Sequence, residues 1–139
     1  MSSYSILGNA PNQVPTNSDL GTMAFQNVDP YVDTRSISTI VAAGAGTVTL
    51  DTYGTGQYRT AKYVVQATYN NYIYASEILV THDGTYVYYT EFGRLTNQPS
   101  GVLAAFTAVL YNGESINFNF TNNAGADVKV TATRIAMNA

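Results

Sequence analysis

Apolar and polar residues alternate along much of the chain after residue 35, as expected for β-strands that bury one face. The clearest example is the segment 114–121, Glu-Ser-Ile-Asn-Phe-Asn-Phe-Thr, in which every second residue is Ile or Phe. The segment 127–136 alternates in the same way, with small apolar residues between Lys and Thr. The residues expected to form the core are Ile116, Phe118, Phe120, Val128 and Val130.

The stretch 58–95 predicts three long strands joined by two tight turns, because it is rich in Val, Ile, Thr and Tyr. One break falls at Asn70-Asn71 and the other at Asp83-Gly84. Asp-Gly favours a two-residue hairpin turn, since both central residues must reach positive φ. The middle strand carries apolar residues on both faces, which predicts that both faces are covered, at least in part.

Further strands are expected on either side of this stretch. The segment 102–111 is compatible with a short helix, but its alternation and its Asn112-Gly113 exit favour a strand in a hairpin. About eight strands at short spacing, with no helix of consequence, predict an all-β fold. We expect an antiparallel, jelly-roll-like β-sandwich. The remaining strands are expected at 36–41 and 47–53.

The first 35 residues have a different character from the rest. They hold three of the four prolines and show no sustained periodicity. We therefore divide the chain into an extended N-terminal arm, residues 1–35, and a β-sandwich domain, residues 36–139. Two readings of the arm stay open, a strap across the chain's own sandwich and an anchor on a neighbouring subunit. The side chains that it would contribute to an interface are Leu20, Met23, Phe25 and Tyr31.

Composition and charge exclude several classes of function. Six basic residues are scattered among nine acidic ones, for a net charge of -3, so no cluster could neutralise several phosphates of a nucleic acid. The chain has no cysteine, and no apolar run is long enough to insert in a membrane. The start of the sequence also lacks the pattern of a signal peptide. Only 11% of residues are charged, which is compatible with surface buried against partner subunits.

Candidate catalytic residues are few. His82 is the one histidine, and beside Asp83-Gly84 it is expected to be a hairpin residue. Glu77 and Glu91 lie on neighbouring strands, but pairing through the Asp83-Gly84 turn would place them on opposite sheet faces. That arrangement disfavours a carboxylate dyad for glycoside hydrolysis. We expect no catalytic residue, no metal and no cofactor, and hence no enzyme.

Tyrosine is the most distinctive residue type, with twelve copies. Those of the central strands are expected to form a broad aromatic patch. Three readings stay open: cross-strand packing, a protein interface, and a surface for sugar rings. The residues assigned to the patch as interface candidates are Tyr72, Tyr74, Tyr86 and Tyr88.

Five stretches carry a resemblance to known proteins: 14–26, 58–68, 74–85, 90–93 and 128–136. Together they resemble β-domain structural and fibre-associated proteins from the virions of tailed bacteriophages, including those that infect cyanobacteria. The resemblance covers nearly the whole chain, from about Val14 to Ala136. It carries no catalytic residues that could be transferred.

The resemblance implies a virion structural protein on the particle exterior, made in the host cytoplasm. The first placement is an accessory capsid decoration (cement) subunit that binds neighbouring subunits by its arm and its Tyr-rich sheet. A small tail-fibre, neck or baseplate attachment protein and a host-glycan-binding module are the alternatives. The expected partners are the major capsid or neck and tail proteins. We also expect the chain to form a homo-oligomer, for which a trimer is one arrangement.

Overall fold

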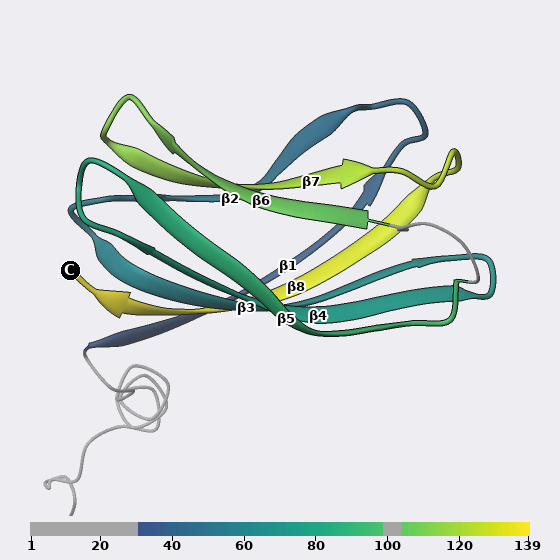
Figure 1. Ribbon diagram of the computed structural model, residues 1–139, viewed down its shortest axis with the longest axis horizontal. Helices are drawn as coiled ribbons and strands as arrows, with labels where there is room; N and C mark the ends of the chain where they lie inside the picture. The colour runs from purple at the N-terminus through teal and green to yellow at the C-terminus, as the bar shows by residue number, and fades with distance from the viewer. Residues whose placement is uncertain (1–30, 99–103) are drawn as a thin grey trace, which may run out of the picture. The chain divides into compact units, whose positions relative to one another are not determined.

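The computed structural model describes residues 31–98 and 104–139 as eight antiparallel strands in two sheets that face one another (Figure 1). The predicted all-β sandwich is therefore confirmed, and segment 104–111 is a strand. The strands are β1 (Val32–Val41), β2 (Thr47–Gly54), β3 (Tyr58–Tyr69), β4 (Tyr72–His82), β5 (Val87–Thr96), β6 (Ala104–Tyr111), β7 (Ser115–Asn122) and β8 (Val128–Asn138).

One sheet has five strands in the order β1-β8-β3-β4-β5, and the other has three in the order β2-β7-β6. The chain crosses between the sheets at β1–β2, β2–β3, β5–β6 and β7–β8, and it forms hairpins within a sheet elsewhere. The predicted three-strand stretch is β3-β4-β5, three of the five strands of the larger sheet. The strands at the sheet edges are β1 and β5 in the larger sheet and β2 and β6 in the smaller one.

The hairpin turns agree with the sequence at two places and differ from it at the third. The β3–β4 turn has two residues between the paired Tyr69 and Tyr72, and Asn70 takes a positive φ of 50°. The β6–β7 turn places both Asn112 and Gly113 at positive φ, 52° and 69°, as the Asn-Gly signal requires.

The predicted two-residue turn at Asp83-Gly84 is wrong. The last pair of the β4–β5 ladder is His82 with Val87, so the loop has four residues. The Asp83 carboxylate accepts hydrogen bonds from the backbone N–H groups of Thr85 and Tyr86, at 2.8 and 2.7 Å. This side-chain bonding stabilises the longer loop, because an Asp at the start of a turn replaces a backbone acceptor.

The core lies between the two sheets and is centred on stacked aromatic rings. The ring centroids of Tyr63 and Phe118 are 3.8 Å apart and nearly parallel, and Phe106 stacks against Phe118 at 5.6 Å. Each ring buries a large apolar area, and offset stacking adds to that burial. All five residues that alternation assigned to the core are fully buried, so this prediction is confirmed.

The sandwich begins earlier than predicted. Strand β1 starts at Val32 and pairs in unbroken register with β8 as far as Val41, so residues 32–35 belong to the sheet and not to the arm. No pattern in the sequence indicated this, because Asp33, Thr34 and Arg35 are polar residues without a clear alternation. The rest of the predicted arm, residues 1–30, lies outside the described residues.

Candidate functional site

The predicted tyrosine patch is divided in the structure. Tyr74 is 1% exposed and packs in the core against Phe106, so its assignment to a contact face is wrong. The physical reason is its position on the inner side of β4, the same face as Ser76 and Ile78. Its hydroxyl donates to Glu91, and burial, with that hydrogen bond, raises the pKa of Tyr74 to about 12.

The remaining predicted interface residues are far apart or outside the described part. Tyr72 lies at the start of β4, where its ring contacts that of Tyr69 at 5.2 Å. Tyr86 and Tyr88 are exposed near the opposite end of β4, ten residues or about 33 Å away along a strand. Tyr31 is exposed ahead of β1. Leu20, Met23 and Phe25 lie outside the described residues.

The outer face of the five-stranded sheet carries the largest set of exposed apolar side chains in the described residues. We call it the apolar face. Registers place its members on one side, because residues directly opposite in a ladder share a face. All five strands contribute, and sequence alternation already indicated apolar residues on both sides of the middle strand. Its members are Ile40, Val64, Ile73, Leu79, Tyr88, Phe92, Leu95, Ile135 and Met137.

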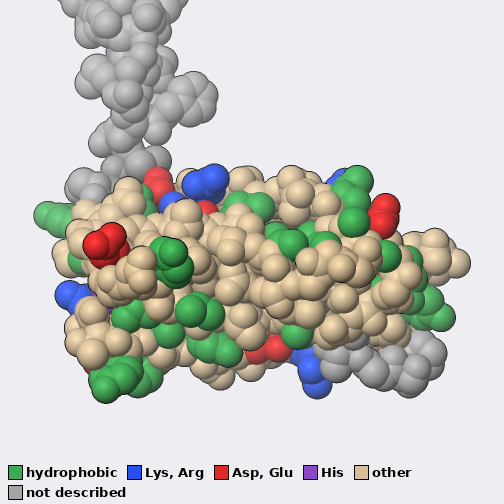
Figure 2. Space-filling view, turned by 90° about the horizontal axis from the view of Figure 1, so that it is seen from above, with side chains coloured by type: hydrophobic (Ala, Val, Ile, Leu, Met, Phe, Trp, Pro, Cys, Tyr) green, Lys and Arg blue, Asp and Glu red, His purple; other side chains and the backbone are tan. Residues whose placement is uncertain are grey.

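The outer face of the three-stranded sheet, here the polar face, is different. Cross-strand hydrogen bonds join Thr and Asn side chains of β2 and β7, including Thr49 to Asn119 at 2.9 Å and Thr52 to Asn117 at 2.8 Å. Seen from above, this side of the sandwich shows mainly polar side chains and backbone (Figure 2). Its large exposed apolar residues are Val109 and Tyr111. Because the two outer faces differ in polarity, we expect the five-stranded face to contact a partner and the three-stranded face to contact solvent.

A charged pair lies in the middle of the apolar face. Lys62 of β3 and Glu77 of β4 form an ion pair with Nζ and Oε1 2.9 Å apart, and both side chains are about two-fifths exposed, 42% and 38%. Each residue is near the midpoint of its strand. The pair places one positive and one negative charge side by side near the centre of a face on which the exposed apolar side chains alternate with Thr and Ser residues, and Lys129 adds a further charge on β8.

A shallow hollow of about 370 Å³ lies on the same face, toward the β4–β5 turn. Leu79 and Tyr88 give it apolar walls, and Thr60, Thr81 and Thr90 bring hydroxyl groups to it. Aromatic and hydroxyl groups together can contact an apolar side chain or a sugar ring. No Asp, Glu, His, Lys or Arg lines the hollow, and its titratable groups are the phenols of Tyr88 and Tyr89.

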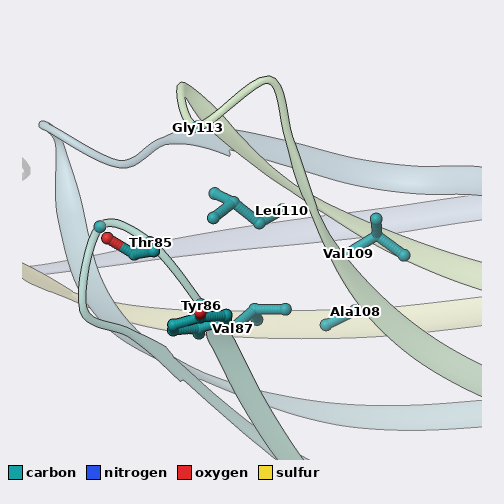
Figure 3. A pocket seen from close by; sticks show the side chains of 8 residues that line it. Thr85, Tyr86, Val87, Ala108, Val109, Leu110 and Gly113 are labelled. Atoms are coloured by element: carbon teal, nitrogen blue, oxygen red, sulfur yellow. The ribbon is translucent and has the colours of Figure 1, made fainter.

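A larger groove of about 580 Å³ opens where the edge strands β5 and β6 meet (Figure 3). Thr85, Tyr86 and Val87 come from the β4–β5 hairpin, and Leu110 lies between this hairpin and the one that follows β6. Ala108 and Val109 of β6 also line it. Apart from the hydroxyl groups of Thr85 and Tyr86, the lining is apolar or backbone, so the groove offers mainly contact area.

The titratable residues that do cluster lie inside the sandwich. Asp51 of β2 is fully buried and receives two short hydrogen bonds on Oδ2, from the Tyr63 hydroxyl at 2.7 Å and from Nη1 of Arg134 at 2.8 Å. Burial raises the pKa of Tyr63 well above its usual value, and the Asp51 charge adds to the effect. Burial acts to lower the pKa of Arg134, but the Asp51 charge reverses this, so the net shift is upward.

The same guanidinium joins the edge strand β1 to the cluster. Nη2 of Arg134 lies 3.1 Å from Oδ2 of Asp33, which also accepts from the Tyr58 hydroxyl at 2.9 Å. The guanidinium carbon lies 5.6 Å from the ring centre of Tyr53 and 5.1 Å from that of Tyr58. The buried ion pair, with these partners, therefore links the two sheets of the sandwich.

The catalytic candidates from the sequence occupy structural positions. His82 is buried, its Nδ1 accepts from the Gly84 N–H at 3.1 Å, and its Nε2 lies 2.7 Å from the Tyr58 carbonyl. Both ring nitrogens are therefore used. Glu77 is opposite Phe92 on the outer face, whereas Glu91 is opposite Ile78 on the inner face. The predicted separation of the two carboxylates onto opposite faces is confirmed, although the register differs from the predicted one because of the longer turn.

The described ranges contain neither a group of metal ligands nor a membrane-spanning helix. In residues 31–98 and 104–139, no group of three or more His, Asp or Glu side chains could hold a metal ion. Within the same part of the chain, no helix has the length and hydropathy of a bilayer-spanning segment.

No family model and no curated protein matches the chain. Among solved structures, the tailspike protein of Acinetobacter phage vB_ApiP_P1 is similar over 81% of this chain, at 17% identity and a TM-score of 0.37. The similar region spans 23% of the tailspike, so this chain corresponds to about a quarter of that protein's length. A likeness at this TM-score carries no argument about the function of the chain.

Proposed function

We propose that the chain is an adhesive structural subunit on the exterior of a phage particle and has no enzymatic activity. The observation that carries the adhesive part is the contrast between the apolar face and the polar face. Nine large apolar side chains are exposed on the first, whereas the second shows two, Val109 and Tyr111, among Thr and Asn residues. Large exposed apolar patches mark interaction sites in stable soluble proteins.

The particle assignment rests on the sequence resemblance to β-domain virion proteins. We place the chain as a capsid decoration subunit that holds the major capsid protein or a neighbouring subunit. Attachment to a tail fibre, neck or baseplate is the alternative. In this role the buried ion pair between Asp51 and Arg134 holds the two sheets together, and the apolar face supplies the contact area. Low surface charge fits a protein whose surface is buried in an assembly.

Purified particles test this proposal directly. Particles of the phage that encodes the chain would be banded by density and probed with an antibody against the domain. We expect the chain to band with the particles, and immunogold labelling to separate head, neck and tail placement. A chain recovered only from the soluble fraction would overturn the proposal.

Two matched variants test whether the apolar face is the adhesive surface. Val64 on the apolar face and Val109 on the polar face are 46% and 45% exposed, so Val→Glu has a similar cost to folding at either position. We expect Val64→Glu to abolish incorporation into particles and Val109→Glu to leave it unchanged. Equal incorporation of both variants would assign attachment to another surface.

A host-glycan-binding module is the second candidate, favoured by the hollow beside Tyr88. Its aromatic and threonine lining could stack on and hydrogen-bond to a sugar. A glycan array followed by titration with Tyr88→Ala and Tyr86→Ala tests this reading. Saturable binding that Tyr88→Ala removes would support it, and an array without binding would reject it.

A further inference from the structure

We propose that two copies of this chain associate through their apolar faces, around a two-fold axis that passes near the Lys62–Glu77 pair. This inference rests on the proposed adhesive function and names the partner of the same surface. The partner is a second copy, and the contact is sheet against sheet.

The size of the face suits such a contact. Five strands of ten to twelve residues form the sheet. With strands about 4.8 Å apart and a rise of about 3.3 Å per residue, the face covers about 800 Å². A stable interface of standard size buries about 800 Å² on each partner. Two twisted sheets can also pack face to face in the aligned geometry of a sandwich.

The central charges are the reason to choose a second copy over an unrelated protein. Lys62 and Glu77 lie side by side at mid-strand, with Nζ and Oε1 2.9 Å apart. A two-fold rotation about an axis between them brings each lysine opposite the glutamate of the other copy. The face is thus complementary to itself, because apolar residues meet apolar residues and each central charge meets an opposite charge. An isologous interface requires such self-complementarity. Across the interface, the two pairs would become a four-charge network that also fixes the register.

Two matched substitutions test the surface. In sedimentation experiments on the full chain we expect twice the mass of one chain for the wild type. Val109→Glu should retain this mass, whereas Val64→Glu should sediment as a single chain, because it buries an unpaired charge in the interface. We expect the dimer dissociation constant of Val64→Glu to rise by at least about 100-fold. Circular dichroism checks that both variants stay folded.

Charge reversal tests the two-fold arrangement itself. Lys62→Glu gives two negative charges at the centre of the face, and Glu77→Lys gives two positive charges. Each variant alone should be monomeric, because like charges meet across the axis. An equimolar mixture should form a one-to-one heterodimer, because each face then meets its complement. A surface meant for an unrelated partner would show no such rescue.

Several outcomes would overturn the inference. They are a monomeric wild type, a Val64→Glu variant that keeps the dimer mass, and a mixture of charge-reversed variants that stays monomeric. Failure here is distinct from failure of the proposed function. A monomeric wild type that still enters particles, with Val64→Glu excluded, would reject the second copy and keep the adhesive role. A stable dimer absent from particles would keep the dimer and reject the virion role.

Discussion

Nη1 of Arg134 in β8 lies 2.8 Å from Oδ2 of Asp51 in β2, so a buried ion pair joins the five-stranded sheet to the three-stranded sheet. Both side chains are almost fully buried, at 5% and 0% exposure. The Tyr63 hydroxyl and Asp33 supply further partners to the two charges. Both further partners come from the five-stranded sheet, and their hydrogen bonds help to offset the loss of hydration of the pair.

Removing one member of this pair should be costly, because the other is left buried and uncompensated. We expect Asp51→Ala and Arg134→Met each to lower the free energy of unfolding by about 3–5 kcal/mol. The double variant should lose clearly less than the sum, with a coupling of about 2–3 kcal/mol in a double-mutant cycle from urea denaturation. Arg35→Met is the control. Arg35 is exposed and 3.6 Å from Asp51, so it should cost less than about 1 kcal/mol. Additive single effects would contradict a coupled pair.

Two buried tyrosines near this pair should respond oppositely to loss of their hydroxyl groups. The Tyr63 hydroxyl donates to the charged Asp51 at 2.7 Å, so Tyr63→Phe should cost about 1.5–3 kcal/mol. The Tyr53 hydroxyl is buried without a hydrogen-bond partner among the described residues. Tyr53→Phe should therefore be neutral or raise the free energy of unfolding. Chemical denaturation of both variants measures the difference, and a large loss in Tyr53→Phe would mean that its hydroxyl has a partner.

The buried tyrosines also predict a loss of stability in alkali. Burial raises the pKa of Tyr53 to about 12 and that of Tyr63 further, whereas an unfolded tyrosine ionises near pH 10. Above pH 10 the unfolded chain binds fewer protons than the folded one, so the free energy of unfolding falls as pH rises. The fall is at most about 1.4 kcal/mol per pH unit for each buried tyrosine. It should begin near pH 10 and continue past pH 12.

Absorbance at the tyrosinate band tests this expectation. The buried Tyr53 and Tyr63 should ionise only as the protein unfolds. Tyr53→Phe removes one of the shifted groups and should reduce the slope of stability against pH. A single titration of all twelve tyrosines near pH 10 with the fold retained would be inconsistent with the burial of these side chains.

Alternation was sufficient to predict the sandwich and its core, because a strand with one buried face repeats every two residues. Phe118 and Phe120 are examples, and both are fully buried. The Asp83 turn was harder to predict. Its Asp-Gly pair favours a loop of two residues, but the hydrogen bonds that the Asp83 carboxylate accepts from the N–H groups of Thr85 and Tyr86 favour a loop of four. Local dipeptide preference could not show which of these effects would win.

The ion-pair cluster could not be found from the sequence. Asp51 and Arg134 are 83 positions apart, and they meet only because β2 and β8 face each other across the core. The prediction for Tyr74 was wrong for a related reason. Tyrosine occurs both in cores and at interfaces, and Tyr74 is buried because the three-stranded sheet covers its face of β4. Apolar residues on both sides of β4 did indicate the apolar face in the sequence. We expected that face to be covered, at least in part, whereas in the structure its side chains are exposed.

The position of the domain boundary leads to a truncation experiment. An arm that ends at residue 35 would include the first residues of β1, which begins at Val32. In β1, Oδ2 of Asp33 lies 3.1 Å from Nη2 of Arg134 and 2.9 Å from the Tyr58 hydroxyl. Deletion of residues 1–30 should leave the thermal midpoint nearly unchanged, because β1 and the core are kept. Deletion of residues 1–35 removes four strand residues and both Asp33 contacts. We expect it to lower the midpoint by about 5–10 °C, from a loss of about 2 kcal/mol. Asp33→Ala in the full chain is the control, and it should reproduce only part of that loss. A protein that unfolds on deletion of residues 1–30 would show that those residues contribute to the sandwich itself.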